Sequence, residues 1–243
     1  MIFESEHIVG LSGGKDSSAL ALRLREVEPR PYTYLITPTG DELPEMRDHW
    51  NRLADMLETP LTVVTAPGGT LSEQIAQQNC LPNHRIRWCT RKLKIEPCLA
   101  YMKARPGSVL YVGLRADEPE RKGIYDSAIT CRFPLREWGW GVGDVRGYLR
   151  ERGVVIPERT DCARCYAQRK SEWERLYWNQ PGIWQEAAGQ EAATGHTFRY
   201  GESLERMASQ FAARGRPFRQ LSMFSGTDEL DDSDISACRV CSL

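Results

Sequence analysis

The sequence lacks the features that mark a membrane or secreted protein. Its 243 residues contain no apolar run approaching the roughly 20 residues that a membrane-spanning helix needs. The first residues, MIFESEHIVG, have no basic segment followed by an apolar one, so they do not indicate a secretory signal. We therefore expect a cytoplasmic protein with no membrane segment.

Excess charge of either sign is also missing. Lys and Arg number 32 against 33 for Asp and Glu, which gives a formal net charge of −1. This balance excludes a global attraction to nucleic acid and leaves room only for a local basic face. Hydrophobic residues make up 41% and charged residues 27%, a mixture that can bury a core and argues against wholesale disorder.

Cysteine is the unusual residue of the composition, with eight in the chain. In a reducing cytoplasm these cysteines are not expected to form a disulfide framework. Metal ligation or sulfur chemistry is therefore the leading interpretation.

The N-terminal half alternates short apolar, β-branched segments with helical ones. We predict strands over residues 7–11, 32–37, 61–64 and 108–113, and helices over 17–24, 45–57 and 92–104. This alternation indicates an α/β fold, a doubly wound parallel sheet with helices on both faces. Ligands of such sheets bind outside the carboxyl ends of the strands, so segments 12–14, 39–41 and 114–117 should lie near one another.

The composition changes after about residue 140. We predict a nucleotide-binding domain over residues 1–140 and a small helical, cysteine-rich subdomain over 141–243, with helices near 144–152, 171–178 and 201–214. The five tryptophans of residues 138–184 could stack on bases, but packing of a small subdomain is the expected use. The histidines have no ligand-like spacing and are expected to be structural or surface residues: His7, His49, His84 and His196.

Residues 12–17, SGGKDS, form a Gly-rich turn between a predicted strand and a predicted helix. Such a turn lets backbone N–H groups approach an anion, and the helix N-terminus adds partial positive charge. The spacing is not that of a Walker loop, so γ-phosphate hydrolysis is not the first choice. An ordinary strand-to-helix turn is the alternative.

SGGKDS resembles the signature of the PP-loop ATP pyrophosphatases. Further segments resemble the branch that contains phosphoadenosine-phosphosulfate (PAPS) reductase, and the CT-x-x-LK segment with a later CxxC is most similar to the DNA-phosphorothioation enzymes DndC and SspD and related phage proteins. The resemblance covers roughly residues 8–180. The segments that carry it are TGDELPE at 39–45, RWCTRKLK at 87–94, GLRADE at 113–118, FPLREW at 133–138 and Asp144-Val145.

The resemblance implies an adenine nucleotide alpha hydrolase-like (HUP-type) fold and cleavage of ATP between its α- and β-phosphates. An acceptor oxygen is adenylated, pyrophosphate leaves, and a sulfur or nitrogen nucleophile then displaces AMP. Such a transfer needs positioning and charge neutralisation more than a protein nucleophile. The nucleotide site is expected at Ser12, Gly13, Gly14, Lys15, Asp16, Ser17, Thr39, Gly40, Asp41, Lys92 and Arg115.

Within this set, individual residues have candidate roles. Lys15, Arg115, Lys92 and Lys94 are candidate phosphate clamps, with solvated surface charge as the alternative for those outside the loop. Asp16 is a candidate Mg²⁺ ligand or loop orienter, and Asp41 could serve the ribose or the metal. The expected catalytic residues are Lys15, Asp16, Arg115 and Cys238.

Two CxxC pairs, 162–165 and 238–241, indicate a metal site, since each pair can chelate from a tight turn. A [4Fe–4S] cluster is the preferred interpretation, zinc the alternative, and no metal the third. The expected ligands are Cys89, Cys162, Cys165 and Cys241, with Cys238 as the alternative fourth. The leftover Cys238 would be a working thiol that carries or relays sulfur. Ordinary packing is expected for Cys80, Cys98 and Cys131.

Four functions compete on these motifs. The first is ATP-dependent activation of a DNA backbone phosphate for sulfur insertion, with a cysteine desulfurase or other sulfur donor as partner. The second is a PAPS or adenylylsulfate reductase, disfavoured because the sequence lacks an ECGLH-type C-terminal segment. The others are a tRNA-thiolating enzyme and a non-catalytic nucleotide-sensing or scaffold subunit, which the intact loop argues against. An oligomer is compatible with the sequence.

Overall fold

A computed structural model describes residues 5–121 and 129–217, and the contacts within it divide the chain into two compact units. The first unit takes in the described chain up to Leu71 and the range Trp88–Asp161. The second contains Ser72–Arg87 and the described chain from Cys162 onward. The domain boundary predicted at residue 140 stays a prediction. No helix among the described residues is long and apolar enough to cross a membrane.

The first unit contains a five-stranded parallel sheet, which confirms the predicted fold class. The strand order is β3-β2-β1-β4-β5. The strand bounds are His7–Gly10 for β1, Tyr32–Ile36 for β2, Thr62–Val63 for β3, Val109–Tyr111 for β4 and Thr130–Arg132 for β5. The order reverses between β1 and β4, so the switch point where such sheets bind ligands lies at their carboxyl ends.

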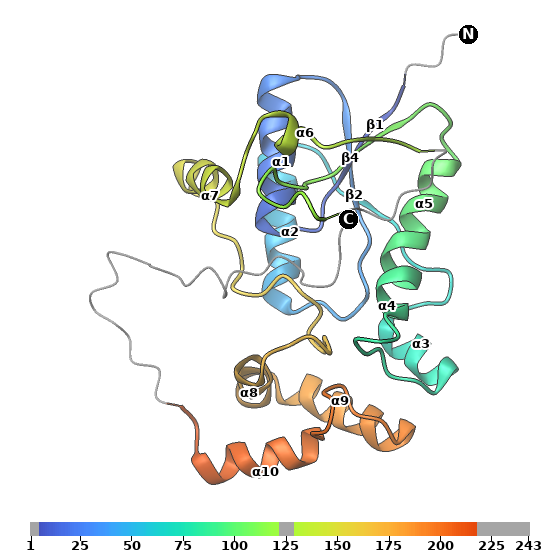
Figure 1. Ribbon diagram of the computed structural model, residues 1–243, viewed down its shortest axis with the longest axis vertical. Coiled ribbons are helices and arrows are strands. Elements are labelled where there is room, and N and C mark those ends of the chain that lie inside the picture. The colour runs from blue at the N-terminus through green and yellow to red at the C-terminus, as the bar shows by residue number, and fades with distance from the viewer. Residues whose placement is uncertain (1–4, 122–128, 218–243) are drawn as a thin grey trace. The chain divides into compact units, whose positions relative to one another are not determined.

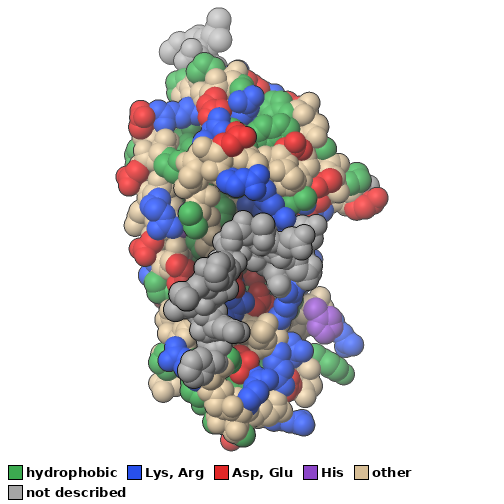
Figure 2. All heavy atoms as spheres, turned by 90° about the vertical axis from the view of Figure 1, so that its left-hand side faces the viewer, with side chains coloured by type: hydrophobic (Ala, Val, Ile, Leu, Met, Phe, Trp, Pro, Cys, Tyr) green, Lys and Arg blue, Asp and Glu red, His purple; other side chains and the backbone are tan. Residues whose placement is uncertain are grey.

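Each face of the sheet packs against its own helices, as Figure 1 shows. One face is covered by α1 (Lys15–Val27), α2 (Pro44–Leu57) and α7 (Val142–Glu151), and the other by α5 (Glu96–Lys103). Because neighbouring side chains of a strand point to opposite faces, Val9 of β1 packs with α1 while Ile8 packs with α5. Basic and acidic side chains are mixed over the face seen in Figure 2, in keeping with the near-zero net charge.

The helix predicted over 92–104 is divided into three pieces. A short α4 (Trp88–Thr90) leads into a π-helical turn, η1 (Arg91–Ile95), and α5 follows. Pro97 stands at the start of α5. Since proline has no N–H to donate to the carbonyl four residues earlier, the regular ladder is interrupted there and the turn widens.

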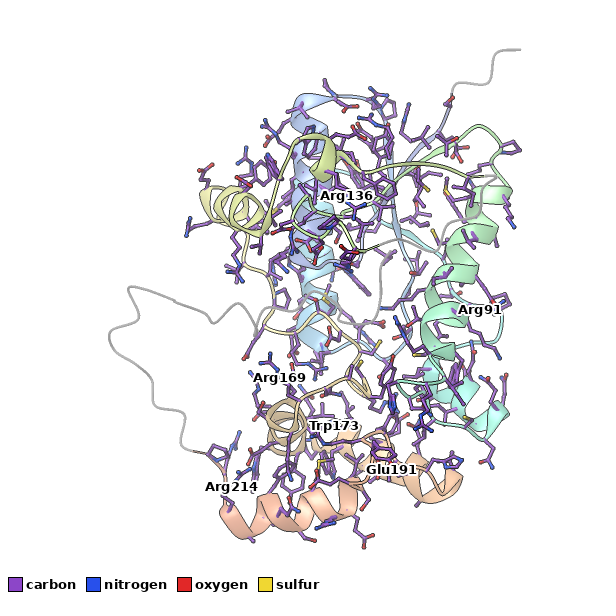
Figure 3. All side chains as sticks on the ribbon, viewed as in Figure 1. Arg91, Arg136, Arg169, Trp173, Glu191 and Arg214 are labelled. Atoms are coloured by element: carbon purple, nitrogen blue, oxygen red, sulfur yellow. The ribbon has the colours of Figure 1, made fainter. Side chains whose placement is uncertain are left out.

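The second unit is helical. It contains α8 (Lys170–Asn179), α9 (Pro181–Thr194), α10 (Leu204–Arg214) and most of α3 (Leu71–Gln78); the short α6 (Pro134–Glu137) belongs to the first unit. The core of the helical unit is aromatic: Trp173 packs against Trp184 and Phe198, with ring centroids 6.1 and 5.7 Å apart. Trp173 is fully buried, and it lies with Glu191 among these helices in Figure 3. Trp173 and Trp184 therefore have the packing role that was expected for them.

Candidate functional site

The predicted phosphate loop follows β1 and opens α1, where its serine hydroxyls hold the turn. The Ser17 hydroxyl lies 3.0 Å from the Ser12 hydroxyl and accepts a hydrogen bond of 3.1 Å from the Gly13 N–H. The Ser12 hydroxyl accepts from the Gly14 N–H at 3.3 Å. The loop is therefore ordered around its own side chains, and the first residues of α1 are buried.

Gly13 is required by both its conformation and its surroundings. Its φ is +82°, in the left-handed region, and a Cβ there would lie 2.1 Å from Met46 Cε and 2.6 Å from Trp50 Nε1. Trp50 also donates to the Ser12 carbonyl at 3.2 Å. Helix α2 thus presses on the loop and fixes its shape, which leaves no room for a side chain at this position.

Each of the three nitrogens of the Arg115 guanidinium forms an ion pair with a carboxylate. Nη1 lies 2.9 Å from Asp16 Oδ2, Nε 2.8 Å from Asp117 Oδ1, and Nη2 3.1 Å from Glu118 Oε1. The guanidinium is buried. In this arrangement Arg115 holds Asp16 in place at the switch point between β1 and β4. Its predicted role as a phosphate clamp stays a prediction.

Lys15 and Asp16 form a buried pair of opposite charge, with Nζ and Oδ2 3.8 Å apart. Burial lowers the pKa of Lys15, and burial raises the pKa of Asp16 against the opposing effects of Lys15 and Arg115. The second oxygen of Asp16, Oδ1, is buried without a hydrogen-bond partner among the described residues. A carboxylate oxygen left open in this way fits a Mg²⁺ ligand, because Mg²⁺ binds oxygen donors through one or two carboxylates and substrate phosphates.

Arg136, which is labelled in Figure 3, supports this site through hydrogen bonds to backbone carbonyls. Its Nε donates to the Arg115 carbonyl at 3.2 Å, and its Nη2 donates to the carbonyls of Glu118 and Arg121 at 2.7 and 2.8 Å. The sequence placed Arg136 in a family-like segment without giving it a role. Only the fold shows that it holds the segment that carries Arg115.

The predicted second segment of the site follows β2, the neighbour of β1. Thr39 donates from its N–H and its hydroxyl to Glu42 Oε1, at 2.6 and 2.7 Å, and the Gly40 N–H donates to Oε2 at 3.0 Å. Asp41 is buried. Glu42, which the sequence did not single out, thus closes this turn at the carboxyl edge of the sheet.

The two predicted lysines outside the loop lie on η1. Lys92 is exposed and Lys94 half-buried. Their roles as clamps stay predictions.

The cysteines of the first CxxC pair lie on one tight turn, in which the Cys165 N–H donates to the Cys162 carbonyl at 3.2 Å. Both side chains are half-buried, and none of the six described cysteines forms a disulfide. Cys89 belongs to the other unit, and Cys238 and Cys241 lie outside the described residues. Within the described ranges, no three His, Cys, Asp or Glu side chains gather as a metal site. The four-ligand set therefore stays a prediction.

Arg164, inside the CxxC turn, anchors that turn to the helical unit. It is 3% exposed, its Nη1 lies 2.7 Å from Glu186 Oε1, and its Nη2 donates to the Ser72 hydroxyl at 2.9 Å. Ser72 in turn donates to the same Glu186 oxygen at 2.6 Å. The pair of cysteines is thus held by a buried arginine that no sequence motif indicates.

Cys98 and Cys131 lie in the apolar cluster between β4, β5 and α5. Burial raises the pKa of Cys98 to about 12 and that of Cys131 to about 11. Thiols so strongly held in the protonated form are poor nucleophiles. Their placement agrees with the packing role predicted for them.

His49 lies on α2, next to Trp50, and is 1% exposed. Burial lowers its pKa to about 4, and the neighbouring charge of Arg52 acts in the same direction. The ring is therefore neutral in the folded protein at pH 7, which agrees with the structural role predicted for it.

This burial predicts an acid-sensitive stability. The unfolded chain takes up a proton at His49 below its ordinary pKa of 6.5 and the folded chain does not until about pH 4, so the contribution is complete above pH 6.5 and is lost as the pH falls toward 4. The loss is at most about 3 kcal/mol. His49→Leu should flatten that part of the pH dependence in urea unfolding, whereas His196→Gln, at an exposed position, should not. An unchanged slope in His49→Leu would contradict this.

The fold and site define a class of protein: a parallel α/β nucleotide-binding protein with its phosphate loop at the switch point of the sheet. Residues 6–158 match the phosphoadenosine phosphosulfate reductase domain. The chain belongs to this enzyme family, which has the PP-loop type of nucleotide site. No curated protein sequence matches it.

Three solved structures match this chain at low sequence identity. The PAPS reductase from Candida auris, in a phosphate complex, is 17% identical over 65% of this chain and 77% of its own, with a TM-score of 0.50. The NMN synthetase from Francisella tularensis is 18% identical over 92% of this chain and 90% of its own, with a TM-score of 0.46. The U34-tRNA thiolase NcsA from Methanococcus maripaludis, with its [4Fe-4S] cluster, is 15% identical over 86% of this chain and 82% of its own, with a TM-score of 0.48.

Proposed function

We propose that this chain is an ATP pyrophosphatase that adenylates an acceptor, with a DNA backbone phosphate as that acceptor, and that it supports sulfur insertion of the DNA-phosphorothioation type. The observation that carries the proposal is the buried group at the phosphate loop. There Lys15, Asp16 and Arg115 lie together and Asp16 Oδ1 has no described partner. A loop of this kind suits a transfer at a phosphate, where positioning and charge neutralisation dominate.

In the proposed reaction, an acceptor oxygen attacks the α-phosphorus of ATP. The bond from that phosphorus to the bridging oxygen breaks, and pyrophosphate leaves with the electron pair. The N–H groups at the start of α1 and the Lys15 ammonium would hold the phosphates. Mg²⁺ held by Asp16 would neutralise phosphate charge, because Arg115 is already engaged by carboxylates. A sulfur nucleophile from a desulfurase or another donor would then displace AMP.

The experiment that tests the reaction follows the products of ATP. With Mg²⁺ and a DNA acceptor, the protein should release pyrophosphate, and label in the α-phosphate should pass to AMP or to the adenylated acceptor. ADP and inorganic phosphate as products would contradict the proposal. Pyrophosphate release that needs RNA and not DNA would keep the chemistry and overturn the acceptor.

The cysteines are proposed to hold a [4Fe–4S] cluster through Cys89, Cys162, Cys165 and Cys241, with zinc as the alternative. The tight turn of the first pair, which Arg164 anchors to the helical unit, suits a thiolate-ligated centre. When bound, the cluster would supply a site for the sulfur atom that is transferred. Cys238 is the candidate thiol that relays that sulfur.

A cluster predicts a coloured protein. Purified without oxygen, the chain should be brown, with broad absorption near 400 nm and bound iron and sulfide. Cys162→Ser should lose iron, whereas Cys98→Ser, in the apolar cluster of the sheet, should keep it. A colourless preparation that contains only zinc would remove the cluster from the proposal.

The match to the phosphoadenosine phosphosulfate reductase domain supports a second hypothesis, that the chain is a PAPS reductase. A PAPS reductase would release sulfite from PAPS with thioredoxin as the electron donor. If sulfite appears and no pyrophosphate is released from ATP, the phosphorothioation proposal is wrong and the reductase reading takes its place.

A further inference from the structure

An exposed aromatic ring of the second unit, Tyr200, contacts His84 in a segment that carries two exposed arginines, Arg85 and Arg87. Tyr200 is 86% exposed, the highest value among the large apolar side chains of the described residues. Ile86 is also well exposed, at 54%. The His84 and Tyr200 rings meet edge to face, with centroids 6.2 Å apart and planes at 88°. We name the set of residues 84–87 and Tyr200 the Tyr200 surface.

Both parts of the Tyr200 surface are held in fixed turns. The side-chain oxygen of Asn83 accepts hydrogen bonds of 2.9 Å from the N–H groups of Arg85 and Ile86. Tyr200 occupies the second position of a turn in which the Glu202 N–H donates to the Arg199 carbonyl at 3.3 Å. Gly201 follows with φ +74°, as the third position of a type II turn requires. The ring is therefore presented to solvent by ordered backbone.

The charge of the Tyr200 surface is uniformly positive. Arg85 and Arg87 are exposed, and neither has a carboxylate partner among the residues that the structure describes. The sequence has no Asp or Glu from residue 74 to residue 95. In a chain of net charge −1, this stretch is a local basic segment of the kind that a nucleic-acid partner requires.

We infer that the Tyr200 surface binds a single strand of DNA, with a base stacked on the Tyr200 ring and phosphates on Arg85 and Arg87. An open aromatic face with adjacent cations is the combination by which proteins hold single strands without reading their sequence. The choice of DNA rests on the proposed function, in which DNA is the acceptor. The surface would supply the attraction that the overall charge does not.

The test measures binding without ATP, by fluorescence anisotropy of the full chain with a labelled deoxythymidine strand roughly 15 nucleotides long. Tyr200→Ala should weaken binding by roughly 5- to 150-fold, the range for loss of one base–aromatic stack, and Tyr200→Phe should restore it. Arg85→Ala/Arg87→Ala should make the slope of log K against log salt shallower by about 1.4, from two phosphates at about 0.7 each. Tyr200→Ala should leave that slope unchanged.

The matched control is Arg150→Ala/Arg206→Ala, which removes the same charge at two other exposed positions and should leave the affinity within about twofold. Equal weakening by this control would overturn the surface in favour of diffuse attraction. Wild-type affinity in Tyr200→Ala, or tighter binding of an RNA strand of equivalent sequence, would overturn it as well. Because ATP is absent, failure here with intact pyrophosphate release refutes the surface and not the chemistry. Binding without pyrophosphate release refutes only the chemistry.

Discussion

Lys15→Ala is expected to abolish pyrophosphate release from ATP. Lys15 is 4% exposed at the start of α1, and its ammonium is the one cation of the phosphate loop itself. Preorganised charge in a buried site stabilises a transition state far more than the same charge in water, and removal of one such donor costs about 2.7–4 kcal/mol, or roughly 10²- to 10³-fold in rate. Release of pyrophosphate from α-labelled ATP measures the loss.

Lys15→Met separates charge from packing, because methionine fills much of the same space without a cation. The methionine variant should still fold, because Asp16 keeps its ion pair with Arg115 when the Lys15 ammonium is removed. It should be as inactive as the alanine variant. Lys103→Ala, at an exposed position, should keep full activity. Substantial activity in Lys15→Met would show that the ammonium is not part of the reaction.

Glu191→Ala is expected to destabilise the helical unit by about 2–6 kcal/mol, since two buried N–H groups lose their acceptor at about 1–3 kcal/mol each. The carboxylate of this buried residue accepts from the N–H of Phe198 at 2.8 Å and from the N–H of Leu204, the first residue of α10, at 2.7 Å. Glu191 therefore joins α9 both to the following loop and to the start of α10. The free energy of unfolding in urea measures the effect.

Two variants control this result. Glu191→Gln keeps one acceptor oxygen and turns an N–H₂ group toward the other donor, so its loss should lie between zero and that of the alanine variant. Glu205→Ala, in the exposed first turn of α10, should cost less than about 1 kcal/mol. Equal stability of Glu191→Ala and Glu205→Ala would mean that Glu191 is not the link between these elements.

Local patterns predicted the elements that combine good propensity with clear periodicity. The strands that became β1, β2, β3 and β4 were all expected, because β-branched and aromatic runs ended at Gly, Pro or polar turns. The edge strand β5 was not expected, since three residues with an arginine among them carry no strand pattern. Helix α9 was also missed: its Ala-rich sequence begins with Pro-Gly and gives little amphipathic contrast.

The candidate site divides in the same way. The phosphate loop could be predicted from the sequence, because its glycines, lysine and two serines lie next to one another between a strand and a helix. The ion pairs of Arg115 could not be predicted from the sequence. Asp16 lies 99 positions away in the chain and reaches Arg115 only through the parallel pairing of β1 with β4. The anchoring of Arg164 by Ser72 across 92 positions is a second example.

By itself, then, the sequence determined the α/β class, the phosphate loop and the surplus of cysteines, because turn chemistry, strand propensity and composition are properties of neighbouring residues. Only the tertiary structure decided which charged groups form ion pairs within the protein and which remain accessible to a ligand. It pairs Arg115 with three carboxylates, leaves Asp16 Oδ1 without a described partner, and presents Tyr200 to solvent against His84 of the basic segment. Burial and charge pairing are set by residues far apart in the chain, and no local pattern records them.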